Sequence, residues 1–278
     1  MLVLTTIAEA RTARRDVGGS LGLVPTMGAL HDGHLALVKQ ARRTNDRVCV
    51  SIFVNPTQFR PNEDLSSYPR NTEHDLELLT AEGVEFVFMP STEEMYPEGF
   101  ETTVDLGPIT ERLEGAARPG HFRGVATVVL KLLNIVQPAR AYFGRKDAQQ
   151  LVVIRKMVRD LDLGVEIVSV DTVRQPDGLA LSSRNINLSA EEREAAPVLW
   201  NALSLAREMW TRGARDGDAF RTRVREFIEG EALARLDYVS VADPATLQEI
   251  ERIQGPTLVS LAVRFGRTRL IDNVTLGE

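Results

Sequence analysis

Residues 21–34, "LGLVPTMGALHDGH", carry the strongest signal for the architecture of the first half of this chain. Its apolar start at 21–25 predicts a strand, its glycines predict a tight turn, and its end predicts a helix from about Gly33 through residue 44. A strand, a turn and a helix in that order are typical of domains in which parallel strands alternate with helices. The turn also carries two of the four histidines of the chain, His31 and His34. This concentration indicates a functional site at the turn.

The segments that follow repeat the alternation of strands and helices. Further strands are expected at 47–55, 84–90, 141–144 and 165–173, and further helices at 71–83, 124–136 and 147–161. Apolar strands separated by helices indicate a parallel sheet that is covered on both faces. The sequence therefore predicts a Rossmann-like, doubly wound α/β domain over residues 1–175.

The pattern changes in residues 176–278, which are expected to form a smaller α+β domain. One helix is predicted over about 188–210, because Ser189 and Glu192 have the spacing of a capping box, and a second is predicted over 216–235. Three short strands are expected at 236–243, 256–266 and 268–276. Their connections are short, which favours antiparallel pairing.

Composition excludes several classes of function. Apolar residues make up 43% and charged residues 26% of the chain, which is ordinary for a soluble globular protein. The formal charge of −6 argues against general binding to nucleic acid or to anionic membrane, so an anionic ligand must meet locally placed positive groups. The pattern of a signal peptide or a membrane span is not found, and we expect a cytoplasmic protein. Cys49, in an apolar strand, is expected to be an inert core thiol.

The two histidines of the turn have three interpretations. A strand, a glycine turn and a helix start place backbone N–H groups and a positive helix end together, which suits the oxygens of a polyphosphate. The spacing matches neither the dinucleotide fingerprint nor the P-loop. A metal site is disfavoured and none is predicted, because His74 and His121 have no ligand spacing relative to the pair. Surface or capping histidines are the remaining alternative.

Two other polar clusters follow predicted strands. "SIFVNPTQF" places Asn55 and Gln58 beyond a strand, where α/β folds bind ligands, although an ordinary Asn-Pro turn has the same appearance. "FGRKDAQQ" places Lys146, one of few lysines, at a helix start. A cation is unfavourable there unless an anion is bound nearby, and a solvated surface lysine is the alternative.

Two loops offer further contacts for an anion. "LALSSRN" presents hydroxyl and guanidinium groups that could close over a triphosphate, although this tripeptide of Ser182, Ser183 and Arg184 is common in loops. "ARPGHFRGVATVV" contains Arg118, His121 and Arg123, which could form a second anion-contact loop or only a basic helix cap.

Taken together, "PTMGALHDGH", "SIFVNPTQF", "RPGHFRGV", "FGRKDAQQ" and "DGLALSSRN" resemble the pantothenate synthetase (pantoate–β-alanine ligase) family, in the family's order. "HDGH" corresponds to the HxGH signature of the nucleotidyltransferase superfamily, and "LSSRN" resembles its KMSKS-like loop. The resemblance implies an enzyme of coenzyme A biosynthesis that condenses pantoate with β-alanine through a pantoyl adenylate and releases AMP and pyrophosphate. It also implies ATP as a substrate, Mg²⁺ bridging the phosphates, and a homodimer, with no nucleic-acid or membrane partner.

The matched positions imply the site residues. The catalytic residues implied are His31, His34, Lys146, Ser182, Ser183 and Arg184. The ATP-binding residues implied are Pro25, Thr26, Met27, Gly28, Gly33, His34, Gly144, Lys146, Asp147, Val173, Leu181, Ser182, Ser183 and Arg184. The pantoate-binding residues implied are Met27, Asn55, Gln58 and Gln150. The C-terminal domain is expected to close over ATP, and no residue stands out as the base for β-alanine.

The sequence departs from the family at three positions. Arg145 stands where the family usually has Glu, Ala148 where Tyr is common, and Leu181 where Met is frequent. None of these changes removes an implied catalytic group, so activity is expected to survive. A sister nucleotidyltransferase and a non-enzymatic nucleotide-binding module remain the rival hypotheses. The polar segment 60–70 is expected to act as a mobile lid.

Overall fold

The computed structural model describes residues 1–278 apart from 61–64 and 67, so the expected lid at 60–70 lies in large part outside the described residues. The chain forms two compact units, which are described separately. The first comprises Met1–Arg145 and Val153–Asp171, and the second comprises Lys146–Val152 and Thr172–Glu278.

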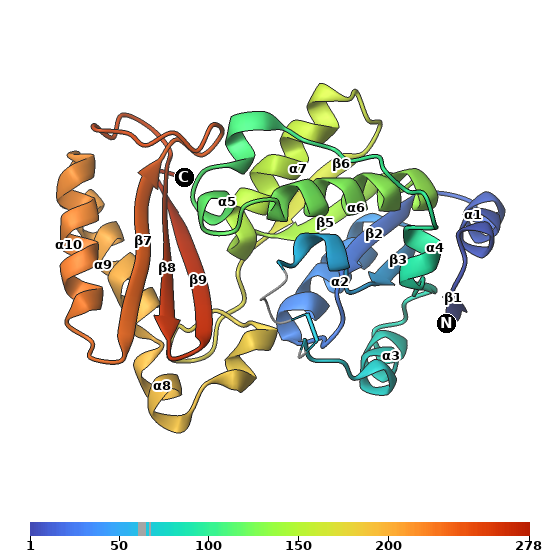
Figure 1. The fold of residues 1–278 in the computed structure, drawn as a ribbon, viewed down its shortest axis with the longest axis horizontal. Coiled ribbons are helices and arrows are strands. Elements are labelled where there is room, and N and C mark those ends of the chain that lie inside the picture. Colours follow the sequence, from blue (N-terminus) through green and yellow to red (C-terminus); the bar gives the residue numbers. More distant parts are fainter. Residues whose placement is uncertain (61–64, 67) are drawn as a thin grey trace. The chain divides into compact units, whose positions relative to one another are not determined.

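A six-stranded parallel sheet forms the centre of the first unit (Figure 1). Its strands are β1 (Leu2–Leu4), β2 (Leu21–Thr26), β3 (Arg47–Ile52), β4 (Phe86–Phe88), β5 (Arg140–Gly144) and β6 (Glu166–Val170). The order in space is β1-β4-β3-β2-β5-β6, and neighbouring strands pair in parallel throughout. From β2 the chain proceeds outward through β3 and β4, and it then returns to the other side of β2 to add β5 and β6. The predicted doubly wound sheet is confirmed, with its topological switch point between β2 and β5.

Helices surround this sheet. They are α1 (Ile7–Asp16), α2 (Asp32–Thr44), α3 (Thr72–Ala81), α4 (Thr92–Met95), α5 (Glu114–Ala117), α6 (His121–Val136) and α7 (Ala148–Asp160), with the short 3-10 helices η1 (Pro56–Gln58), η2 (Gly107–Thr110) and η3 (Arg145–Asp147). The helix expected from 147 begins at Ala148, because the preceding residues form η3. The sequence reading did not anticipate β1 and α1, although Thr6 and Glu9 form a capping box at the start of α1. In the described part of the chain, no helix is both long and apolar enough to span a membrane.

Apolar side chains of β2, β3 and β4 pack against α2 and α3 to make one core of the first unit. Val24, Val50 and Val87, on the three strands, are completely buried there. Cys49 on β3 is buried as predicted, and burial raises the pKa of its thiol to about 12. The thiol is therefore protonated and unreactive at neutral pH.

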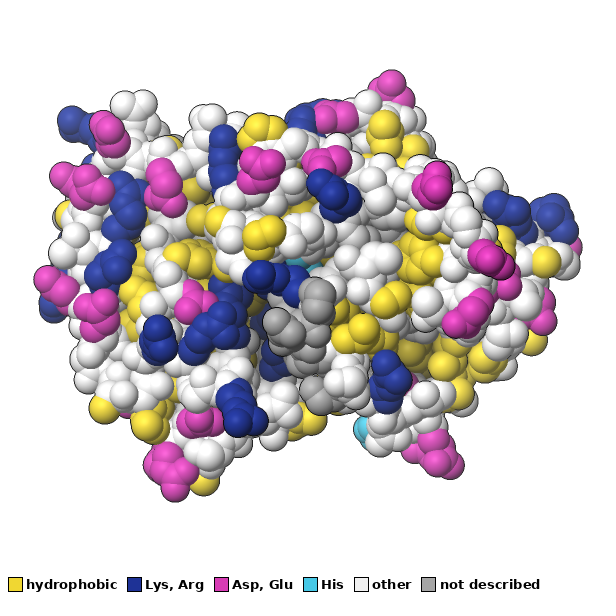
Figure 2. Space-filling view, in the orientation of Figure 1, with side chains coloured by type: hydrophobic (Ala, Val, Ile, Leu, Met, Phe, Trp, Pro, Cys, Tyr) yellow, Lys and Arg dark blue, Asp and Glu magenta, His cyan; other side chains and the backbone are white. Residues whose placement is uncertain are grey.

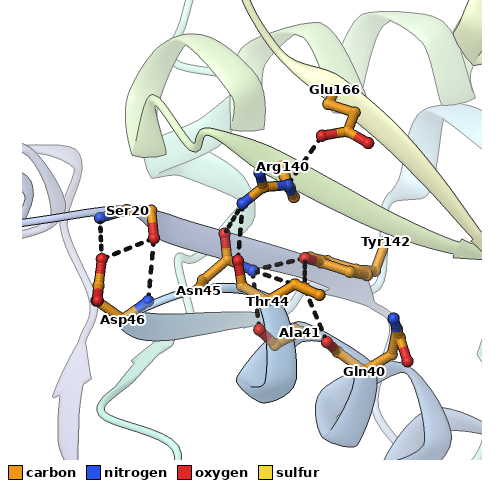
Figure 3. A network of polar contacts seen from close by, with 9 residues as sticks. All are labelled: Ser20, Gln40, Ala41, Thr44, Asn45, Asp46, Arg140, Tyr142 and Glu166. Carbon is orange, nitrogen blue, oxygen red and sulfur yellow. Dashed lines mark hydrogen bonds and ion pairs between the residues drawn. The ribbon is translucent and has the colours of Figure 1, made fainter.

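A polar network connects the amino-terminal ends of the parallel strands (Figure 3). The loops that follow the strands lie at the opposite, carboxyl-terminal edge of the sheet. The hydroxyl of the fully buried Tyr142 lies 2.5 Å from Thr44 Oγ1 and accepts from Asn45 Nδ2 at 2.6 Å. Arg140 donates to the Thr44 carbonyl at 2.7 Å and to Glu166 at 2.8 Å, so the network links α2 to β5 and β6. Its position indicates a structural role.

Replacing Tyr142 with phenylalanine is expected to lower the free energy of unfolding by about 1–3 kcal/mol, because Thr44 and Asn45 lose a buried partner. Urea denaturation followed by circular dichroism measures the change. Catalysis is expected to be unaffected, since the network lies at the opposite end of the strands from the candidate site. A stable variant with lowered activity would contradict this assignment.

The second unit contains a three-stranded antiparallel sheet, as predicted. Its strands are β7 (Ala234–Ala242), β8 (Thr257–Phe265) and β9 (Thr268–Leu276), in the order β7-β8-β9. The helices α8 (Ala190–Ala195), α9 (Val198–Thr211) and α10 (Gly217–Glu229) and the 3-10 helix η4 (Ser183–Asn187) complete the unit. Leu199 and Phe220, from α9 and α10, pack with Val259 of β8 in a single core cluster. Basic and acidic side chains are interspersed over the surface of β7, β8 and α10 that Figure 2 displays. Asp237 of β7 pairs with Arg264 of β8 and with Arg269 of β9.

Two helix predictions in this unit were wrong in extent. The helix expected over 188–210 is divided into α8 and α9 at Pro197, which is the N-cap of α9. Proline has no N–H to continue the hydrogen bonding of α8. Its presence in the sequence was a signal for this break. The helix expected over 216–235 ends at Glu229, beside Gly230.

Candidate active site

The loop after β2 brings His31 and His34 together at the start of α2. His31 is the N-cap of the helix, and its Nδ1 accepts the N–H of Gly33 at 3.1 Å. His34 Nδ1 accepts the N–H of His31 at 3.3 Å, so the two side chains form a reciprocal capping box. The ring centroids are 4.1 Å apart. The capping alternative considered for this pair is therefore realised, and it is compatible with a ligand-binding role.

This arrangement determines the hydrogen-bonding character of both rings. A nitrogen that accepts a backbone N–H must carry a lone pair, so the proton of each neutral imidazole resides on Nε2. In this tautomer His31 and His34 each carry an Nε2–H donor, and both residues lie at the N-terminus of a 13-residue helix. Helix N-termini favour negative charge through their dipole and their unpaired N–H groups. The pair is suited to phosphate oxygens.

A buried carboxylate from α3 holds the turn that precedes these histidines. Asp75 is 1% exposed and accepts the backbone N–H groups of Ala29 at 2.9 Å and of Leu30 at 2.8 Å. The turn has φ of 83° at Gly28 and 50° at Ala29, and the left-handed region costs a residue other than glycine about 1–2 kcal/mol. The contact with Asp75 offsets this cost.

The sequence reading missed Asp75. A signal was present, because Asp75 lies four residues before the buried Leu79 and therefore on the inner face of α3. A charged residue on the buried face of a helix requires a partner. That the partner is the turn at 29–30 could not be read from the sequence.

The strand that leads into the turn separates from one neighbour before it ends. The pairing of β2 with β3 continues to Thr26 and Ile52, whereas the pairing of β2 with β5 stops at Leu23 and Ala141. Pro25, which has no N–H to donate, is tolerated in a central strand because it lies beyond the ladder with β5. Thr26 Oγ1 donates to the Ser51 carbonyl at 2.8 Å, so this hydroxyl joins the two strands where the loop begins.

The loop after β3 is organised around Asn55, which is 1% exposed. Asn55 is the N-cap of η1 and its Nδ2 donates to Gln58 Oε1 at 3.1 Å. Gln58 Nε2 in turn lies 3.1 Å from Met27 Sδ. Three of the four residues implied as the pantoate site therefore lie together in the first unit.

The segment at the start of α6 contacts the same loop. His121 Nδ1 lies 2.8 Å from the Gln58 carbonyl, and Arg118 donates to that carbonyl at 3.4 Å. Arg123 instead pairs with Asp105 at 2.8 Å. A Cβ atom at Gly124 would lie 2.4 Å from the Thr57 carbonyl, so only glycine allows α6 to approach the loop this closely. Arg118 and His121 thus support the backbone of η1.

The second unit carries the residues implied after β5. Lys146 Nζ lies 3.7 Å from Asp147 Oδ1, and the Lys146 carbonyl accepts from Asn273 Nδ2 at 2.9 Å. Gln149 is buried, whereas Gln150 is only partly buried. Of the two adjacent glutamines, Gln150 is therefore the more exposed.

Gly144 and Arg145 belong to the first unit. Gly144 is the last residue of β5, and no atom lies within 4 Å of a Cβ built on it. Arg145, one of the departures from the family pattern, pairs with Asp171 at 3.3 Å.

The loop 173–182 of the second unit forms a hairpin, closed by a bridge between Arg174 and Ala180, that leads into η4. Leu181 N donates to the Val173 carbonyl at 2.9 Å, which brings these two implied ATP contacts together. Ser182 is the N-cap of η4 and its Oγ accepts the N–H of Arg184 at 3.3 Å, with Ser183 between them. All three residues of this tripeptide are partly exposed.

An ion pair supports this hairpin. Arg174 pairs with the buried Asp272 at 2.5 Å, donates to the Gly178 carbonyl at 3.1 Å, and lies 3.9 Å from the centroid of the Trp200 ring. Asp272 is followed on β9 by Asn273, which holds the Lys146 carbonyl. The hairpin and the Lys146 backbone are therefore supported by adjacent residues of one strand.

The comparisons with known proteins agree on one family. A model of the family described as pantoate-beta-alanine ligase matches residues 2–275. The pantothenate synthetase of Chloroflexus aurantiacus (strain ATCC 29366 / DSM 635 / J-10-fl) is 63% identical over 276 residues, which cover 98% of this chain and 97% of the relative. That of Roseiflexus sp. (strain RS-1) is 60% identical over 276 residues, which cover 99% of both chains.

Solved structures give the same result. The crystal structure of pantothenate synthetase from Thermus thermophilus has a TM-score of 0.95 and 49% identity, and the match covers 100% of both chains. The pantoate-beta-alanine ligase from Francisella tularensis, crystallised with beta-gamma ATP and beta-alanine, has a TM-score of 0.81 and 36% identity, with 99% of this chain and 97% of that chain covered.

Proposed function

Because the chain belongs to the pantoate–β-alanine ligase family, we propose that it uses ATP to join pantoate to β-alanine through an enzyme-bound pantoyl adenylate. In the first step a carboxylate oxygen of pantoate attacks the α-phosphorus of ATP, the bond to the β-phosphate breaks, and pyrophosphate leaves. In the second step the free amine of β-alanine attacks the acyl carbon, the bond to the adenylate oxygen breaks, and the nitrogen releases a proton as AMP leaves with pantothenate as the product. The barrier in the first step is the approach of one anion to a polyanion, together with alignment.

The observation that carries this proposal is the reciprocal capping of α2 by His31 and His34. It supports a role in which two preorganised Nε2–H donors and a helix N-terminus receive the phosphates of ATP. Such donors stabilise developing charge without reorganising during the reaction. In the second unit, Lys146, Ser182, Ser183 and Arg184 are proposed to bind phosphate oxygens as well, because cations and hydroxyls are the groups that this ligand requires.

The remaining implied residues have roles that follow from their chemistry. Gln58 and Gln150 are proposed to bind the hydroxyl and carboxylate oxygens of pantoate, with Met27 beside Gln58. Asp147 is proposed to lie near the ribose of ATP. The loop residues Pro25, Thr26, Met27, Gly28 and Gly33 are proposed to contact ATP. Gly144, Val173 and Leu181 are proposed to contact the nucleotide as well.

Mg²⁺ is proposed to accompany ATP. Within the described residues, no group of three or more His, Cys, Asp or Glu side chains is placed to hold a metal ion. We propose that the ion is held by phosphate oxygens and water, which is how Mg²⁺ commonly enters ATP sites. The bound ion would neutralise part of the phosphate charge. A homodimer, which the family resemblance implies, is part of the same proposal.

Isotope exchange between pyrophosphate and ATP tests the proposal, because exchange requires reversible formation of the adenylate. We expect exchange that depends on pantoate and does not require β-alanine. Exchange that depends on a different acid would refute pantoate as the substrate. A protein that binds ATP but gives no exchange with any acid would support a binding module instead.

A further inference from the structure

We propose that Tyr96 is a positioning residue of this reaction, which acts through Asn55 to direct the N–H of Gln58 toward an oxygen of pantoate. The inference rests on the proposed function, since it assumes that Gln58 binds pantoate. Tyr96 comes from a different part of the chain, directly after α4, and it reaches the buried amide of Asn55.

The amide of Asn55 is saturated by the protein itself. Its Nδ2 donates to the Gly124 carbonyl at 3.2 Å and to Gln58 Oε1 at 3.1 Å. Its Oδ1 accepts from the Tyr96 hydroxyl at 2.7 Å, from Thr57 Oγ1 at 3.0 Å and from the Thr57 N–H at 3.4 Å. An amide side chain offers two N–H groups and two lone pairs, and all of them are used. Asn55 therefore has no capacity left for a substrate and can act only through its neighbours.

The partners of Asn55 determine which way its amide faces. The Gly124 carbonyl can only accept, so the NH₂ group of Asn55 must face it. The oxygen then faces the two hydroxyls and the Thr57 N–H, and the Tyr96 bond is the shortest of the three. Burial raises the pKa of the Tyr96 phenol, so this hydroxyl retains its proton and remains a donor at neutral pH.

The orientation of the Asn55 amide determines the orientation of the Gln58 amide. Because Asn55 Nδ2 donates to Gln58 Oε1, the Gln58 amide must turn its NH₂ group the other way, and Nε2 indeed lies 3.1 Å from Met27 Sδ. A thioether is a weak acceptor. A hydroxyl or carboxylate oxygen of pantoate is a better partner for this N–H, so the chain from Tyr96 through Asn55 makes Gln58 a donor toward the substrate.

Aromatic and cationic neighbours hold Tyr96 in place. Its ring lies 5.1 Å from the Phe100 ring and 6.2 Å from the Phe53 ring, measured between centroids. Lys131 Nζ lies 4.5 Å from the Phe100 centroid and 5.6 Å from that of Tyr96. A phenylalanine at position 96 would keep these ring contacts, so Tyr96→Phe removes the hydroxyl alone.

The test is pyrophosphate–ATP exchange in Tyr96→Phe, measured against the concentrations of pantoate and of ATP. We expect the KM for pantoate to rise about tenfold, the effect of one lost hydrogen bond, with the KM for ATP within about twofold of wild type. In a Gln58→Ala background the same substitution is expected to change the KM for pantoate by less than about twofold, because residues that act through one another are not additive. Tyr142→Phe is the matched control, since it removes a buried hydroxyl at the other end of the strands (Figure 3).

Each other outcome has a definite meaning. An unchanged KM for pantoate in Tyr96→Phe overturns the inference, and so does an equal rise in both KM values, which indicates general loosening of the fold. A full tenfold effect that persists in Gln58→Ala overturns it as well. Wild-type protein without pantoate-dependent exchange refutes the proposed function, and this inference with it.

Discussion

His34→Ala is expected to lower pantoate-dependent pyrophosphate–ATP exchange about 100- to 1,000-fold, the usual effect of removing one preorganised donor that stabilises transition-state charge. The loss should occur mainly in kcat, because the Nε2–H of His34 is proposed to bind phosphate oxygens whose charge changes as pyrophosphate leaves. His74→Ala is the matched control. His74 has a 55% exposed side chain on α3 and a partner, Glu77, at 3.9 Å, and its loss should leave exchange unchanged.

Two conservative variants separate the roles of the two ring nitrogens of His34. Asparagine places an amide oxygen near the position of Nδ1 and can accept the His31 N–H, but it has no donor at the distance of Nε2. Glutamine reaches the position of Nε2 with an N–H group. We therefore expect His34→Gln to retain more exchange activity than His34→Asn, measured at saturating ATP. The opposite order would indicate that His34 contributes by capping α2 and not by binding phosphate.

Asp75→Asn is expected to lower exchange about 100-fold, because misplacing a reacting group by about 1 Å can cost that much. The substitution replaces one of the two carboxylate oxygens with an NH₂ group, which then faces the N–H of Ala29 or of Leu30. One backbone donor loses its partner, and the left-handed turn at 28–29 loses part of its support. The free energy of unfolding should fall by about 1–3 kcal/mol.

A second aspartate provides the matched control for Asp75. Asp46 accepts the N–H of Ser20 at 2.7 Å and its hydroxyl at 2.8 Å, at the end of the sheet away from the candidate site (Figure 3). Asp46→Asn makes the same chemical change to a carboxylate that holds a backbone, and we expect exchange within about twofold of wild type. Urea denaturation and exchange kinetics are measured on the wild-type protein, on Asp75→Asn and on Asp46→Asn. If Asp75→Asn is less stable but exchanges normally, the carboxylate supports the fold without positioning the histidines.

The sequence by itself was sufficient for the elements whose signals are local. The strand at 21–25 and the glycine turn that follows it could be predicted, because a run of apolar side chains indicates the strand and glycines indicate the turn. The placement of His31 at the helix start follows from the same local signals. The doubly wound sheet follows in turn from the alternation of such segments, because parallel strands require crossover connections. Pro197 shows that local information can also be overlooked.

Only the tertiary structure decided how the loops at the ends of the strands are held. Asp75 reaches the turn at 29–30 across 45 and 46 positions of sequence, and Tyr96 reaches Asn55 across 41. Such contacts produce no periodic pattern in the sequence. A single hydrogen bond between distant residues depends on the packing of the whole unit and not on the sequence neighbours of either residue. The sequence determined which groups are available for the chemistry. The packing determined which of them face a ligand and which, like Asn55, are used entirely to position a neighbour.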